Sequence, residues 1–72
     1  MTKTEILKKI ANARLTSRLF LYKGKLEETS VYDRVTDKLI VTAEEMGVDW
    51  NEIESALLDA NETAEMCRDE LM

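Results

Sequence analysis

The sequence predicts an all-α protein, an antiparallel three-helix bundle, and three observations support this. The chain contains no proline and only two glycines, Gly24 and Gly47, among 72 residues. Strong helix formers fill the stretches between these glycines. In each stretch apolar residues recur at spacings of three and four, which is the period of one helical face. The connections are short, so neighbouring helices are expected to run antiparallel.

The first expected helix covers residues 4–22 and carries two adjacent apolar stripes. These are Ile6, Ile10, Ala13, Ser17 and Phe20, and beside them Ala11, Leu15, Leu19 and Tyr22. A helix that is apolar on two faces contacts more than one neighbour. It is therefore either the most buried helix of the bundle or part of a homodimer interface. Gly24 is suited to the left-handed conformation that ends a helix.

The second expected helix covers residues 31–46 and begins after Ser30. Ser30 followed by Asp33 resembles a capping box, in which a side chain accepts from a backbone N–H of the first turn. The predicted core stripe is Tyr32, Val35, Leu39, Thr42 and Met46. Gly47 ends this helix.

The third expected helix covers residues 50–71, with Asp49 and Glu52 as a second capping box. Its stripe alternates spacings of three and four without interruption: Trp50, Ile53, Leu57, Ala60, Ala64, Cys67 and Leu71. Such regularity favours one continuous helix through Asn61.

Composition limits the function classes. The length predicts a single helical domain over residues 1–72, and the lone cysteine, Cys67, excludes an internal disulfide. A single thiol and the lack of a signal peptide or membrane-length apolar run favour a cytoplasmic protein. The net charge of −5 is unevenly distributed. Residues 1–26 carry seven basic residues against one acid, whereas residues 27–72 carry three against fourteen. We expect the basic first helix to pack against the acidic ones.

Residues 43–57, AEEMGVDWNEIESAL, resemble the helix-turn-helix of bacterial repressors in the spacing around Gly47. DNA affinity comes mainly from Lys and Arg side chains that neutralise phosphates. This stretch holds five carboxylates and no Lys or Arg. A DNA-binding regulator is therefore an alternative hypothesis, and nucleic acid is a disfavoured partner.

Residues 33–71 also resemble a ubiquitin-associated domain, a three-helix fold. The family's Met-Gly turn corresponds to Met46-Gly47, and its central Ala-Leu to Ala56-Leu57. The last helix of the family would follow Asn61. The resemblance implies ubiquitin binding through the Met46-Gly47-Val48 turn and the Leu71 end.

The chain shows no pattern of catalysis, and we predict a non-enzyme with no cofactor and no bound metal. It contains no histidine, which is the commonest general base. Residues 59–70, DANETAEMCRDE, are spaced like an EF-hand calcium loop, but Ala64 stands where glycine makes the sharp turn. A continuous acidic helix is the favoured interpretation of this stretch.

The outer face of the third helix is the candidate partner-binding surface. It combines acids with two apolar residues: Glu52, Leu58, Asp59, Glu62, Glu65, Met66 and Asp69. Methionine suits an adaptable binding surface. The alternative is that another helix, for example the two-sided first helix, covers Leu58 and Met66.

The predicted function is a small, acidic, non-enzymatic modulator or inhibitor, a type frequent among phage-encoded proteins. It would bind a partner protein with a basic or amphipathic surface, for example the nucleic-acid-binding surface of that partner. No membrane partner is expected. A homodimer through the first helix is a further hypothesis.

Overall fold

The computed structural model describes the backbone of residues 1–71 and the side chains of residues 1–68. The chain forms three helices, α1 (Lys3–Tyr22), α2 (Leu26–Glu45) and α3 (Trp50–Leu71). The expected all-α three-helix bundle is confirmed. The third helix runs without a break through Asn61, so the continuous helix predicted for residues 50–71 is also confirmed.

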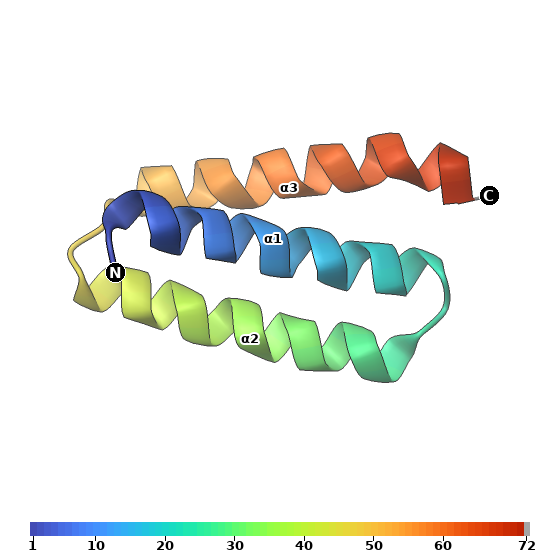
Figure 1. The fold of residues 1–72 in the computed structure, drawn as a ribbon, viewed down its shortest axis with the longest axis horizontal. Coiled ribbons are helices and arrows are strands. Elements are labelled where there is room, and N and C mark those ends of the chain that lie inside the picture. The colour runs from blue at the N-terminus through green and yellow to red at the C-terminus, as the bar shows by residue number, and fades with distance from the viewer. Residues whose placement is uncertain (72) are drawn as a thin grey trace.

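Helix α1 is the central element of the bundle. It packs along both α2 and α3, whereas α2 and α3 touch each other at very few positions. Figure 1 shows α1 between the other two helices, with α2 antiparallel to both. The molecule is correspondingly flat, measuring 39 × 22 × 16 Å along its principal axes. The two apolar stripes of α1 therefore have partners within one chain.

Both connections are helix-terminating turns of the same kind. At the end of α1, Lys25 N–H donates to the Phe20 carbonyl (2.9 Å) and Gly24 N–H to the Leu21 carbonyl (3.0 Å). This is the Schellman pattern, which requires positive φ at the glycine, and Gly24 has φ 76°. Such a turn closes the helix in three residues and allows α2 to start at once.

The second turn repeats the pattern and also contributes to the core. Val48 N–H donates to the Ala43 carbonyl and Gly47 N–H to the Glu44 carbonyl, each at 3.0 Å. Gly47 has φ 80°. Both Val48 and Ala43 are buried, which is the apolar contact that often accompanies this motif.

The apolar core lies at one end of the bundle. It joins the first turns of α1, the last turn of α2 and the first turn of α3, through Ile6, Ile10, Ala43, Val48 and Ile53. Leu7, Leu39, Ile40 and Leu57 pack against this cluster. The turn at residues 46–49 closes the core from its end.

The opposite half of the α1–α2 interface combines polar contacts with one aromatic pair. Ser17 donates to Asp33 Oδ1 (2.5 Å), and an Arg14 terminal nitrogen, Nη1, lies 3.5 Å from the same oxygen. Phe20 and Tyr32 stack with ring centroids 5.6 Å apart. Arg14 Nε is buried without a hydrogen-bond partner. This half therefore contributes less apolar burial than the core end.

The predicted start of the second helix is wrong. The helix begins at Leu26, and Ser30 is an exposed residue inside it rather than its N-cap. The N-cap, Lys25, makes no side-chain cap bond, but Glu27 and Glu28 occupy the first turn. Acids there interact favourably with the helix dipole and offset the missing cap.

The predicted core stripe of the second helix is wrong in part: Leu39 packs against the apolar core, but the buried residues of α2 lie on another side of the helix. The buried residues of α2 are Thr29, Thr36 and Ala43, whereas Val35 is 38% exposed and Met46 40% exposed. Thr29 and Thr36 each donate a hydroxyl hydrogen bond to a carbonyl of their own helix, at 2.8 Å. Because the hydroxyls are satisfied locally, both threonines can be buried against α1.

Within the part of the chain that the structure describes, no helix is both long and apolar enough to cross a membrane.

Candidate functional site

The start of α3 is fixed by a side-chain cap and by an ion pair to α1. Asp49 Oδ1 accepts a hydrogen bond from Asn51 N–H (3.0 Å), so Asp49 caps the helix as predicted. Glu52, the other member of the predicted capping box, instead lies 2.7 Å from Lys3 Nζ on α1. This ion pair ties the start of α3 to the start of α1.

The inner and outer faces of α3 differ sharply in burial. Ile53, Ala60 and Ala64 are buried, and Leu57 packs against the core. On the outer face, Leu58 is 53% exposed and Met66 77% exposed. No other helix of the described chain covers these two side chains, so the alternative that α1 covers them is not found.

The acids of the outer face are solvent-exposed. Asp59, Glu62 and Glu65 are all exposed, and helical spacing places Glu62 one turn from both Leu58 and Met66. The face is therefore an acidic surface with two exposed apolar side chains. We call Leu58, Asp59, Glu62, Glu65 and Met66 the outer α3 face.

Two predicted site residues stand apart from this surface. Glu52 is half-buried and paired with Lys3, so it lies at the edge of the α1–α3 contact. The predicted residue Asp69 lies outside the described side chains.

Polar contacts fix the orientation of α3 beyond its first turns. Arg18 Nε of α1 donates to Asn61 Oδ1 (3.3 Å). About two turns further along α3, the Arg68 guanidinium lies 5.4 Å from the Tyr22 ring centroid, a cation–π contact. These contacts hold the inner face against α1 and direct the outer face to solvent.

The basic helix neutralises its acidic neighbours in part, as the charge pattern predicted. Both ion pairs of the described side chains join α1 to another helix, Lys3 to Glu52 and Arg14 to Asp33. Neither involves the outer α3 face, whose acids are exposed to solvent.

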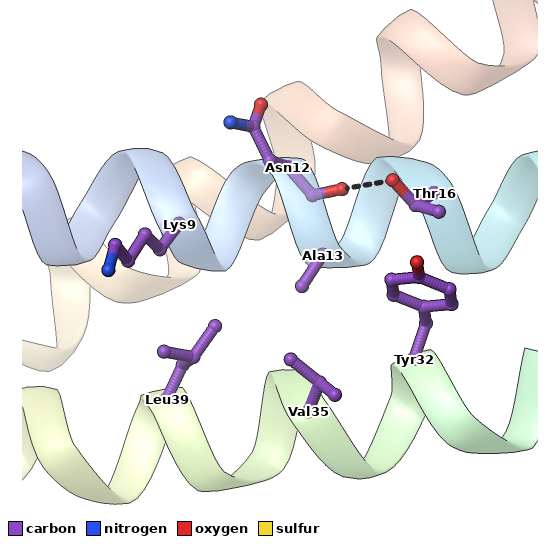
Figure 2. Close-up of a pocket in the computed structure, with 7 residues that line it drawn as sticks. All are labelled: Lys9, Asn12, Ala13, Thr16, Tyr32, Val35 and Leu39. Atoms are coloured by element: carbon purple, nitrogen blue, oxygen red, sulfur yellow. Dashed lines mark hydrogen bonds between the residues drawn. The ribbon is translucent and has the colours of Figure 1, made fainter.

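A second surface feature was not predicted from the sequence. An open groove of about 320 Å³ lies between α1 and α2. Its lining comes from both helices: Lys9, Asn12, Ala13, Thr16, Tyr32, Val35 and Leu39. Figure 2 shows Val35, Leu39 and Tyr32 reaching from α2 toward α1. We call this feature the α1–α2 groove.

The groove contains much of the stripe that the sequence assigned to the core. Tyr32, Val35 and Leu39 share one side of α2, and that side points toward α1 and lines an open groove. The signal was therefore in the sequence, as an apolar stripe of helical period. Of these three residues, Leu39 packs against the core as predicted, whereas the exposed Val35 was wrongly assigned to the interior.

The geometry of residues 33–71 differs from both resemblances. A helix-turn-helix packs its two helices on each other at about 90–120°, whereas α2 and α3 lie antiparallel on opposite sides of α1 (Figure 1). A ubiquitin-associated domain would require three helices here, whereas the structure has part of α2 and the whole of α3. The calcium-loop-like stretch at residues 59–70 is helical within α3, as expected.

Among the described residues, no group of three or more His, Cys, Asp or Glu side chains gathers closely enough to hold a metal ion. Cys67 is free and partly exposed, so it is less buried than its place on the predicted stripe indicated.

Comparison with known proteins finds no family model, no curated protein and no solved structure that matches this chain.

Proposed function

We propose that this protein is a small cytoplasmic binding module, a modulator or inhibitor that docks the outer α3 face on a basic or amphipathic surface of a partner protein. The observation that carries the proposal is the exposure of Leu58 and Met66 on an acidic helix. Exposed acids alone are ordinary solvation. Two large apolar side chains left uncovered among them are typical of an interaction surface.

The remaining geometry supports a rigid binding surface. The outer α3 face lies on one continuous helix, whose inner face is held by Ile53, Ala60 and Ala64. A preformed helix loses little conformational entropy on binding. Its carboxylates would favour a partner rich in Lys and Arg, including one whose own ligand is a nucleic acid.

The test is affinity capture from a cell lysate with the whole protein and two charge-reversed variants. Glu62→Lys with Glu65→Lys reverses two exposed acids of the outer α3 face. Asp37→Lys with Glu44→Lys is the matched control, because it makes the same change in net charge at exposed positions of α2. The partner should be captured by the parent and by the control, and lost from the α3 variant.

Two results would contradict the proposal. Equal capture by the α3 variant and the parent would remove the outer α3 face from consideration. Retention of the parent on DNA-cellulose at low salt, strengthened in the α3 variant and abolished by Arg14→Glu with Arg18→Glu, would support the DNA-binding alternative instead.

A further inference from the structure

The α1–α2 groove continues as an apolar stripe along α2. Val31 is 56% exposed, Val35 38% and Met46 40%, and Leu39 is half-buried at the groove wall. Val31, Val35 and Leu39 follow each other at intervals of four residues, so they lie in one row along the helix. A row of this period on an exposed helix fits the apolar side chains of a second helix.

The middle of this surface is basic. Lys9 lines the groove from α1, and Arg34 and Lys38 are exposed on α2. Arg34 lies one turn from Val31, and Lys38 one turn from Val35. Carboxylates lie toward the ends, with Glu5 one turn before Lys9 and Glu28 one turn before Val31. A helix that is complementary to this surface would therefore carry acids at the middle of its apolar face.

The outer α3 face of this same chain has that chemistry. Leu58 and Met66 are separated by eight residues, or about 12 Å along a helix, with Glu62 midway between them. Val31 and Leu39 on α2 are separated by the same eight residues. The outer apolar residues of the two surfaces thus have the same spacing, and the middles of the two surfaces have opposite charge.

Within one molecule the two surfaces cannot meet, because α2 and α3 lie on opposite sides of α1 (Figure 1). We propose that the outer α3 face of one copy docks in the α1–α2 groove of a second copy, so that the protein self-associates head to tail. This inference rests on the proposed function, since it uses the same outer α3 face and names a second copy as its partner. Because the two surfaces differ, each contact leaves one of each free, and the assembly grows beyond a dimer.

The test uses sedimentation of the whole protein and of two variants, each lacking one of the two surfaces. Leu58→Asp with Met66→Asp removes the apolar residues of the outer α3 face. Val31→Asp with Val35→Asp removes them from the groove surface. All four positions are exposed, so helix content and thermal stability should be preserved. Leu26→Asp is the control, a 67% exposed position of α2 outside the groove lining.

The parent and the Leu26 control should increase in mean mass across about 1 μM to about 1 mM, the range in which weak contacts dissociate. Added salt should reduce the mass, because the charges are exposed and screened. Each double variant alone should remain a monomer. Their equimolar mixture should form a complex of one copy of each variant and no larger assembly. The reason is that one variant supplies only the groove and the other only the outer α3 face.

A parent that stays monomeric throughout would overturn the inference. So would an α3 variant that still dimerises while the groove variant does not, because that pattern indicates a symmetric dimer through α2. Neither result affects the proposed function, which fails only if a foreign partner is captured equally with and without the acids of the outer α3 face.

Discussion

At the scale of single residues, Thr29 and Thr36 determine which side of α2 meets α1. The helical spacing of Val35, Leu39 and Met46 predicts a different side of α2 as the core, because that stripe does not include Thr29 or Thr36. Each hydroxyl instead bonds a carbonyl one turn earlier, which leaves the methyl group free to be buried. Small side chains also allow close helix approach, and Ala13 and Ser17 are buried on the facing side of α1.

Thr36→Val tests this interpretation. The side chain is completely buried, and valine keeps its shape while removing a hydroxyl whose partner carbonyl remains bonded within the helix. We expect the free energy of unfolding to stay unchanged or to rise by up to about 1 kcal/mol. Urea denaturation followed by circular dichroism would measure it.

Thr42→Val is the matched control, since Thr42 makes the same local bond to the Lys38 carbonyl (3.0 Å) at an exposed position. It should change stability by less than about 0.5 kcal/mol. A loss of more than about 1 kcal/mol for Thr36→Val alone would show that the hydroxyl makes a stabilising contact beyond its own helix.

At the scale of the helices, α3 was predictable and α2 was predictable only in part. The bounds and most of the inner face of α3 follow from an uninterrupted stripe, and Ile53, Ala60 and Ala64 are buried as expected. Trp50, the first residue of that stripe, was wrongly predicted to be in the core, because it is 52% exposed at the start of the helix. The end of α2 follows from Gly47. The start of α2 does not follow from the sequence in this way. Ser30 is a good N-cap residue, but the turn at Gly24 already places the chain so that a helix begins at Leu26.

The candidate site was likewise predictable from the sequence only in part. The exposed acids and Leu58 could be placed from the sequence because they lie opposite a regular stripe on the same helix. The α1–α2 groove and the Lys3–Glu52 pair depend on the rotation of one helix against another. That rotation depends on how the side chains of two helices fit together. The spacing of apolar residues along one helix does not reveal it.

Ile53→Ala tests the inner face of α3. Ile53 is completely buried in the apolar core, so its truncation should leave a cavity and cost about 2–5 kcal/mol. Against a total stability of about 5–15 kcal/mol, such a loss should lower the melting temperature strongly. Differential scanning calorimetry would measure it.

Leu58→Ala serves as the control on the same helix, because Leu58 is 53% exposed. It should change stability by less than about 0.5 kcal/mol. Equal effects of the two substitutions would mean that the rotation of α3 about its own axis is wrong, and the outer α3 face would then have to be redefined.

At the scale of the whole molecule, the bundle has two unlike ends and two unlike edges. The apolar cluster fills the end where the chain turns from α2 to α3, whereas the other end holds Ser17, Asp33 and a buried Arg14 Nε without a hydrogen-bond partner. The edges carry the basic-centred groove of α2 and the acidic face of α3. Because α1 separates these edges, neither can neutralise the other within one copy.

The unlike ends predict uneven local stability, which native-state hydrogen exchange would measure. Local opening costs most where apolar burial is densest. Amides around Ile10 and Ala43 should therefore exchange slowest, at rates set by global unfolding. Amides around Thr29, in the first turns of α2, should exchange faster through local opening, because the helix lacks a side-chain cap there and packs against the polar half of α1.

Hydrogen exchange of the Ile53→Ala variant tests this prediction most directly. Removing the core side chain lowers the cost of global unfolding, so protection near Ile10 and Ala43 should fall. The exchange rates of amides near Thr29 should stay nearly the same, because these amides exchange through a local opening that costs less free energy and leaves the core intact. If protection fell equally at both ends, the bundle would open as one cooperative unit, and its polar half would be as strongly coupled to the fold as its apolar core.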